Sequence, residues 1–136
     1  MASREEIEAE ERALTYPGAF AAAEALELGC AVAALAPGYE RGVSIAIYRE
    51  SDGMVMFMWA MDDKAPRNVR FLEAKRDAVR SSGHAGLWAD PADPATGGGF
   101  PVRTASGELV AVLTISGLHH GEDHELAVRA LRSVLG

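Results

Sequence analysis

Hydrophobic and polar positions at the start of the chain predict two helices. Ser3 and Glu6 have the spacing of a capping box, and Pro17-Gly18 closes the acidic segment that they open, so residues 1–17 are expected to hold an acidic N-terminal helix. Residues 19–35 are almost entirely alanine and leucine, with larger apolar side chains recurring at helical spacing. A helix this apolar has to be covered on more than one side, so we expect it deep in the domain or at a contact between subunits.

A hairpin follows, because the apolar residues now recur with a period of two. Residues 43–49 (VSIAIYR) alternate, Ser51-Asp52-Gly53 predicts a tight turn, and residues 54–59 (MVMFMW) return as the partner strand. Both faces of this second strand are apolar, so we expect the sheet to be covered on both sides by helices or by another subunit. We interpret its methionine stripe as packing rather than as a source of soft metal ligands.

The second half of the chain predicts one more helix, further strands and a closing helix. The pattern favours a helix over about 66–82, a weak strand over 84–89 (HAGLWA) and a loop rich in proline and glycine after it. FPVRTA and LVAVLTIS then form a hairpin around Ser106-Gly107, and the closing helix is expected over about 124–135. Helices before, between and after two sets of strands indicate a layered α+β domain.

Length and composition are those of a single-domain globular protein. With 136 residues, 49 % of them hydrophobic and 24 % charged, the chain is expected to fold as one domain over residues 1–136. Cys30 is the single cysteine, which excludes an internal disulfide and favours a reducing, cytoplasmic compartment. The acidic start is unlike a signal peptide, and glutamates and Pro37-Gly38 interrupt the longest apolar run, so we expect no membrane span.

The net charge of −7 argues against a general nucleic-acid binder, which needs a basic surface to follow a phosphate backbone. Six of the 13 basic residues, against two acidic ones, lie between positions 64 and 80, so this segment carries +4 and the rest of the chain −11. The simpler interpretation of this segment is a solvated helix face. The sharper alternative is a docking surface for a small anion, such as a carboxylate-bearing ligand, or for an acidic face of another subunit.

Three of the four histidines cluster just before the closing helix. His120 and His124 have a spacing that suits two metal ligands on one helix face, but a glycine separates them and no third ligand follows from the spacing, so no metal site is predicted. His84, His119 and His120 are only weak candidates for metal ligands. The structural alternative makes Asp123 the N-cap of the closing helix, with His124 in its first turn.

Other catalytic signatures are missing from the sequence. The glycines at 97–99 lack the Gly-Lys-Ser/Thr of a phosphate-binding loop, so we interpret them as a hinge between loop and strand. No hydrolase elbow, pair of catalytic carboxylates or Cys/His nucleophile pair is readable from the spacing. These absences weaken the case for a conventional enzyme.

Motifs in the second half resemble the haem-degrading-domain family, which includes the GlcG-like proteins. An uncharacterised branch of that family carries Gly-Gly-x-Phe-Pro-Ile and Ser-Gly-Leu-x-x-x-x-Asp-His, and the matching residues here are Gly98, Gly99, Phe100, Pro101, Val102, Ser116, Gly117, Leu118, Asp123 and His124. The middle helix of the branch is matched by Asn68, Lys75, Val79, Ser81 and Ser82. Phe71 and Ala74 stand where the branch has Trp and Arg, so a pocket shaped by that pair is altered here.

The resemblance implies a GlcG-like, profilin-like fold of three layers, α/β/α, with a five-stranded antiparallel sheet in the order 2-1-5-4-3. It also implies a homo-oligomer, a dimer or larger. Together with the basic helix, it suggests a cytoplasmic small-molecule-binding protein whose ligand is haem or another acidic molecule. The expected ligand-binding residues are Asn68, Lys75, Gly98, Gly99, Asp123 and His124.

Two other functions stay open at this stage. One is a non-catalytic scaffold or partner-binding oligomer, in which the motifs serve assembly. The other is an enzyme that modifies haem or another tetrapyrrole. No axial haem ligand carries over from the family, so His119 and His124 are candidates only by chemistry, with Asp123 setting the tautomer.

Overall fold

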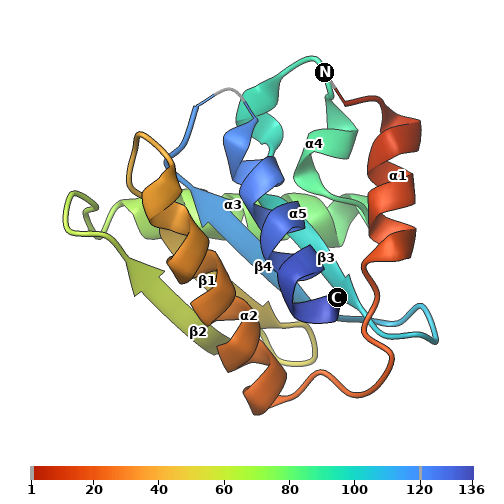
Figure 1. Ribbon diagram of the computed structural model, residues 1–136. Helices are drawn as coiled ribbons and strands as arrows, with labels where there is room; N and C mark the ends of the chain where they lie inside the picture. Colours follow the sequence, from red (N-terminus) through yellow and green to blue (C-terminus); the bar gives the residue numbers. More distant parts are fainter. Residues whose placement is uncertain (1, 120) are drawn as a thin grey trace.

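The structure is a computed structural model that describes residues 2–119 and 121–136, with helices packed around one sheet (Figure 1). The helices are α1 (Arg4–Ala13), α2 (Ala22–Leu35), α3 (Asn68–Ser82), α4 (Gly86–Ala89) and α5 (Glu122–Leu135). The strands are β1 (Ser44–Arg49), β2 (Val55–Ala60), β3 (Gly99–Arg103) and β4 (Leu109–Ser116). Two short 3-10 turns complete the elements, η1 (Ala36–Gly38) and η2 (Pro94–Thr96).

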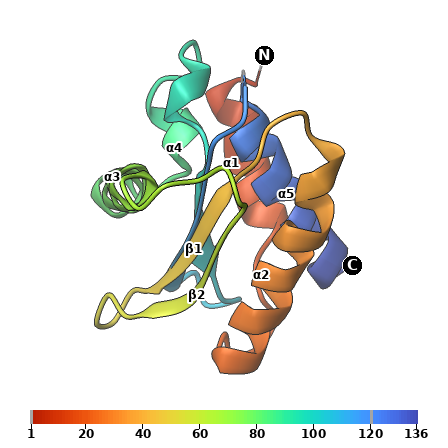
Figure 2. The ribbon, with the colours of Figure 1, turned by 90° about the vertical axis from the view of Figure 1, so that its left-hand side faces the viewer.

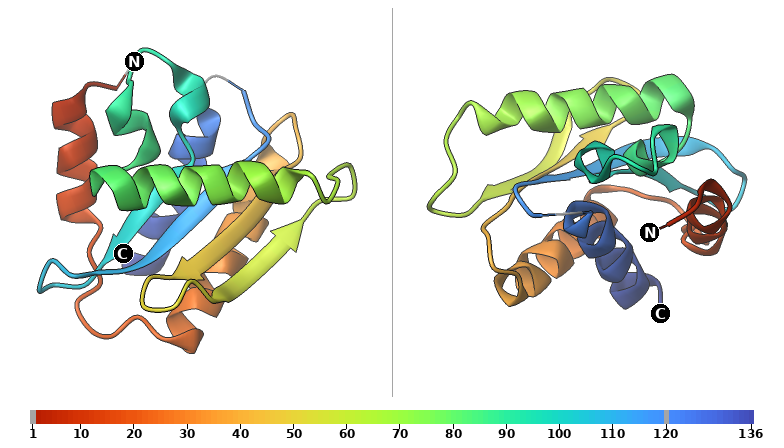
Figure 3. Two further views of the ribbon diagram at one scale, coloured as in Figure 1. Left: turned by 180° about the vertical axis from the view of Figure 1, so that it is seen from behind. Right: turned by 90° about the horizontal axis from the view of Figure 1, so that it is seen from above.

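The sheet separates two layers of helix. Its strands pair antiparallel in the order β2-β1-β4-β3. The helix α3 lies against one face of the sheet, whereas α2 and α5 lie against the other (Figure 2 and Figure 3). The predicted α+β class and antiparallel sheet are therefore confirmed, and the three layers follow the expected α/β/α arrangement.

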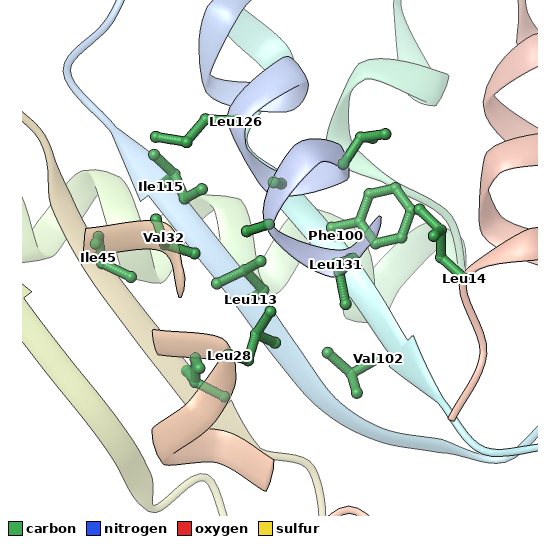
Figure 4. Packing of buried hydrophobic residues seen from close by; sticks show 14 of the residues in the cluster. Leu14, Leu28, Val32, Ile45, Phe100, Val102, Leu113, Ile115, Leu126 and Leu131 are labelled. Atoms are coloured by element: carbon green, nitrogen blue, oxygen red, sulfur yellow. The ribbon is translucent and has the colours of Figure 1, made fainter. Parts of the chain in front are cut away.

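The main core lies between the sheet and the pair formed by α2 and α5. Leu113 of β4, Leu28 of α2 and Leu131 of α5 are fully buried together in this layer (Figure 4). The helix α2 comes close to the sheet at Gly29, where an added Cβ would lie 2.4 Å from the ring of Phe57. The small residues of α2 thus allow a tight approach to β2, as their abundance in the sequence indicated.

The sheet has four strands among the described residues, not the five that the family resemblance implied. Residues 84–89 form the turn α4 instead of a strand, because they pack on α1, where Trp88 Nε1 donates to Glu8 Oε2 at 2.9 Å. The outer edge of β3 is reached by Tyr16, whose N–H donates to the Arg103 carbonyl at 2.8 Å. Without the third predicted strand, the expected order 2-1-5-4-3 becomes the observed β2-β1-β4-β3.

Two apolar surfaces that we expected to be covered are exposed in the single chain. The edge strand β2 leaves Val55 41 % and Met58 47 % exposed, and Leu26 of α2 is 58 % exposed. Helices of one chain therefore do not cover both faces of β2, because α2 packs on it whereas α3 packs on β4, β3 and β1. Coverage of this edge by another subunit stays a prediction.

The predicted helices form with shifted starts. The helix α2 begins at Ala22, α3 begins at Asn68, and the closing helix begins at Glu122 rather than near 124. In the described part of the chain, none of these helices combines the length and apolarity that a membrane crossing requires, and the apolar α2 has only 14 residues.

Candidate functional site

Lys75 of α3 and Asp123 of α5 form a buried ion pair. The Lys75 Nζ lies 3.0 Å from Asp123 Oδ2 and donates a second hydrogen bond, of 2.7 Å, to the carbonyl of Ile115 at the end of β4. The other carboxylate oxygen, Oδ1, accepts from the N–H of Leu118 at 3.0 Å. The side chains of Lys75 and Asp123 are only 14 % and 12 % exposed, so protein acceptors and donors replace most of their water.

The glycines of the Gly-Gly-x-Phe-Pro-like motif make room for this ion pair. Gly98 has φ +117°, and a Cβ there would lie 2.2 Å from the Ile115 carbonyl oxygen and 2.8 Å from Lys75 Nζ. At Gly99, a Cβ would lie 2.8 Å from the Lys75 carbonyl oxygen and from the side chain of Val79. These glycines therefore let α3 pack directly on the start of β3.

Asp123 is not the N-cap of α5. The helix starts at Glu122 with Gly121 as its N-cap, and Asp123 uses its carboxylate to hold the preceding loop through Leu118. Burial raises the pKa of Asp123 above its ordinary value of 3.8, while the charge and hydrogen bond of Lys75 and the Leu118 N–H act in the opposite direction. The first turn of α5 is thus fixed by the loop before it and by α3.

His124 points away from Lys75, toward α1. Its Nε2–H donates to Glu10 Oε1 at 2.8 Å, and its ring lies 5.8 Å from that of Phe100, centroid to centroid. Because a carboxylate only accepts, the lone pair of the neutral ring lies on Nδ1. That nitrogen is buried and finds no hydrogen-bond partner among the described residues. Neighbouring residues Asp123 and His124 therefore belong to different environments.

The environment of His124 is a pocket of about 390 Å³ between α1, α5 and the segment that contains α4. Apolar side chains such as Leu87 and Val128 line it, and four charged residues join them at its wall: Glu10, Glu125, Arg129 and Arg132. A pocket of this size and mixed character suits a small organic ligand.

The charged residues of the pocket differ in how they are paired. Arg129 Nη1 donates to the hydroxyl of Tyr39 at 2.9 Å, and this hydroxyl donates to Glu125 Oε1 at 2.7 Å. Burial, followed by the hydrogen bond to Glu125, raises the pKa of Tyr39. Arg132 makes no ion pair within the part of the chain that the structure describes. Its charge is available to an acidic ligand.

The structure brings together some of the residues predicted to bind a ligand and separates others. Lys75, Gly98, Gly99 and Asp123 meet in the buried ion-pair region. Asn68 lies elsewhere, at the start of α3, where its Oδ1 accepts from the N–H of Ala65 at 2.8 Å. The six residues expected to bind a ligand therefore lie in three places: the ion-pair region, the start of α3 and the surroundings of His124.

The candidate metal ligands are also dispersed. His84 Nδ1 lies 2.9 Å from Glu11 Oε1, and its ring stacks on Trp88 at 4.0 Å. The backbone N–H of His119 donates to Glu122 Oε1 at 3.2 Å. His120 lies outside the described residues. Within residues 2–119 and 121–136, no group of three or more His, Cys, Asp or Glu side chains is placed to hold a metal ion.

Sequence reasoning missed the contribution of α1 to the site. Its glutamates were interpreted only as an acidic helix face, yet Glu10 holds His124 and Glu11 holds His84. The pocket arginines, Arg129 and Arg132, were also missed, although their separation by three residues places them on one side of a helix. That spacing is the one signal from which the basic side of the pocket was predictable.

Comparison with known proteins identifies relatives over most of the chain. The family described as haem degrading protein, HbpS-like, matches residues 20–132. Among curated proteins, the UPF0303 protein SCO2848 of Streptomyces coelicolor is 34 % identical over 149 residues, covering 96 % of this chain and 92 % of the relative.

Two solved structures share the fold. The Ybr137w protein is 25 % identical with a TM-score of 0.84, covering 98 % of this chain and 87 % of the other. The PduOC:heme complex is 20 % identical with a TM-score of 0.71, covering 85 % of this chain and 95 % of the other. At 20 % identity the second likeness extends to the arrangement of helices and strands alone.

Proposed function

The chain belongs to the HbpS-like family of haem-degrading proteins, and on that basis we propose that it is a small-molecule-binding protein whose ligand is haem or another acidic molecule. The proposed site is the pocket beside His124. The observation that carries the proposal is the combination of apolar walls with Arg129 and Arg132 in a pocket of about 390 Å³. The haem present in the PduOC complex, a protein of the same fold, is consistent with it.

The residues of the pocket fit the chemistry of haem. The porphyrin ring is apolar and matches Leu87 and Val128, while its two propionates match Arg129 and Arg132. Arg132 is the stronger candidate for a propionate partner, because Arg129 already donates to Tyr39. The same features accept other molecules with an apolar body and acidic groups. The pocket therefore defines the chemical class of the ligand, and haem is one member of that class.

His124 restricts how the iron of haem would be held. One ring nitrogen is engaged by Glu10 and the other is buried, so neither offers a lone pair to the pocket in this conformation. Ligation by His124 requires that Glu10 release Nε2. Bound haem would supply a redox-active iron. The chain itself supplies arginines for the propionates, apolar walls for the ring, and His124, whose Nε2 is occupied by its hydrogen bond to Glu10.

In this proposal the remaining motif residues do not line the pocket but position the helix that does. Lys75 and Asp123 fix the first turn of α5, which carries His124, and the glycines at 98 and 99 permit that contact. We therefore assign Lys75, Gly98, Gly99 and Asp123 a positioning role. The proposed location is the cytoplasm, where the exposed thiol of Cys30 stays reduced.

Titration of the purified protein with haemin tests the proposal. We expect a saturable change of the Soret band that is weakened when Arg129 and Arg132 are both changed to Gln. An unchanged Soret band in the wild-type protein would remove haem from the proposal. Loss of bound haem on addition of a reductant, with formation of a tetrapyrrole product, would make the protein an enzyme rather than a binding protein.

A second candidate function is an assembling scaffold, which the exposed apolar side chains favour. Leu26 and Val55 are half exposed on α2 and β2, the two elements at one edge of the domain. Unpaired edge strands that carry apolar side chains are covered in most native proteins. We therefore propose that the protein forms a homo-oligomer through this edge, which light scattering coupled to size-exclusion chromatography measures directly.

A further inference from the structure

A second pocket lies on the opposite face of the sheet, between β2 and the start of α3. Its volume is about 270 Å³, and it shares no lining residue with the pocket beside His124. Its walls are largely apolar and include Met58, Val69 and Leu72. Two polar groups among its lining residues, Ser44 and Lys64, lack the partners that buried polar groups normally have.

Ser44 is the first of these two groups. It begins β1, is 4 % exposed, and its hydroxyl oxygen has no hydrogen-bond partner among the described residues. A buried hydroxyl without a partner loses its hydrogen bonds to water and gains none from the protein. Such a group in a pocket wall indicates that a ligand or a water molecule completes its hydrogen bonding.

Lys64 is the second. Its side chain is only 14 % exposed, and the nearest carboxylate oxygen, on Asp63, is 3.7 Å away. The two groups form an ion pair at a separation that is too long for a hydrogen bond. A buried ammonium has three donors to satisfy. A negatively charged acceptor in the pocket would satisfy the Lys64 ammonium.

The two groups lie at the same end of the sheet. Ser44 pairs with Ser116 in the β1–β4 register. The next residue along β4 is Gly117, where an added Cβ would lie 2.9 Å from Lys64 Nζ. The absence of a side chain at Gly117 is what allows the ammonium to approach this end of the sheet.

The start of α3 adds to the positive potential of the pocket. The helix has no acidic residue in its first turn, so its positive end is not compensated there. Asn68, in that first turn, accepts with Oδ1 from Ala65 and retains its Nδ2 group as a donor. The net charge of the segment from 64 to 80, +4, acts in the same direction.

From these observations we infer that the pocket binds a small organic carboxylate. The carboxylate is held by Lys64, Ser44 and the start of α3, and an apolar body packs against Met58, Val69 and Leu72. Apolar walls favour an organic acid over inorganic phosphate, because phosphate leaves those walls unfilled. This site is independent of the haem proposal, since it uses a different face of the sheet.

The test follows amide resonances of the full-length protein during titration with benzoate, a carboxylate that fills a pocket of this size. We expect saturable shifts of residues 44 and 64–69, and any shift of the α5 residues 124–132 reports the separate pocket beside His124 and is fitted on its own. Benzamide, which has the same shape without the charge, and inorganic phosphate, which has charge without the apolar body, should each bind at least about tenfold more weakly.

Two variants examine the assigned contacts. Lys64→Gln should weaken benzoate binding at residues 44 and 64–69 by about tenfold or more, and Ser44→Ala by several-fold, whereas Arg12→Gln, exposed on α1, should leave it unchanged. If Lys64→Gln does not fold, Ser44→Ala and the comparison of benzoate with benzamide still test whether the pocket binds a carboxylate. The inference is overturned by an absence of saturable shifts in the millimolar range, by equal binding of benzamide, or by equal affinity in folded Lys64→Gln or Ser44→Ala.

Discussion

Lys75 and Asp123 are 48 positions apart in the sequence, and their charged atoms lie 3.0 Å apart in the structure. The pair joins α3 on one face of the sheet to the first turn of α5 on the other. The Lys75 ammonium also lies beside the end of β4, where it donates its second hydrogen bond to the Ile115 carbonyl. The residue after Asp123 is His124, so the ion pair sets the position of the proposed binding pocket without lining it.

Removal of Lys75 should destabilise the protein more as the pH rises. Burial raises the pKa of Asp123, so ionisation of this carboxyl disfavours the folded state, and stability falls as the pH rises through the folded pKa. Lys75→Met removes the positive charge and the hydrogen bond that oppose this shift, so the pKa of Asp123 rises further in the variant. We expect a loss of about 3 kcal/mol or more at neutral pH and a smaller loss near pH 3, where Asp123 is protonated. Urea denaturation at both pH values measures the difference.

The double variant Lys75→Met/Asp123→Asn is the control for that prediction. It leaves no uncompensated charge, so it should be more stable than Lys75→Met at neutral pH and should lose the pH dependence. A loss of stability in Lys75→Met that is equal at both pH values would show that packing of the lysine stem, and not the charge of Asp123, is responsible.

Gly98→Ala should destabilise the fold strongly, by about 2–4 kcal/mol. The backbone there has φ +117°, and the new Cβ would overlap the Ile115 carbonyl oxygen at 2.2 Å. Gly18→Ala is the matched control, because no atom lies within 4 Å of a Cβ at that position, and it should stay within about 0.5 kcal/mol of wild type. Thermal and urea denaturation of both variants provide the comparison, and equal stabilities would contradict the close approach at Gly98.

Elements defined by local pattern were predictable from the sequence. The hairpin around Ser51-Asp52-Gly53 and the apolar helix ending at Leu35 depend on turn chemistry and periodicity, which neighbouring residues determine. The family motifs also indicated that Lys75 and Asp123 matter. Their direct contact is a finding of the structure, since the motifs do not say which of their residues pair.

Contacts made by α1 were not predictable in the same way. Glu10 and His124 are 114 positions apart, and neither periodicity nor spacing links an exposed acidic helix to a histidine that far away. The short apolar segment 84–89 was predicted to form a weak strand. Its packing on α1 through Trp88 overrides that local preference, and short apolar runs are commonly ambiguous for this reason.

A charge placed on the exposed edge should disrupt the proposed oligomer. Val55→Lys introduces an ammonium on the edge strand, where charged side chains oppose pairing between chains. We expect a decrease in the mass measured by light scattering, with unchanged circular dichroism. Ser81→Lys, exposed on α3, is the control and should keep the wild-type mass. A monomeric wild-type protein at all accessible concentrations would rule out the scaffold function.

The pocket arginines should determine haemin affinity. Each propionate bonded to a guanidinium contributes a charge-assisted hydrogen bond, so Arg129→Gln/Arg132→Gln should weaken binding by about tenfold or more. Arg80→Gln removes an exposed arginine of α3, on the other face of the sheet, that pairs with Glu50, and this variant should bind as wild type does. Equal affinity of all three proteins would place haemin elsewhere.

Glu10 should control whether His124 reaches the iron. In the wild-type protein the Nε2–H of His124 is held by Glu10 at 2.8 Å, so we expect haemin to bind without a histidine-ligated spectrum. Glu10→Ala removes that acceptor and frees Nε2, since the remaining buried nitrogen is Nδ1. The variant should then show a shifted Soret band typical of a nitrogen ligand, and Glu10→Ala/His124→Ala should lose the shift. A histidine-ligated spectrum already present in wild type, and retained in His124→Ala, would assign the ligand to another residue and end the role proposed for this pair.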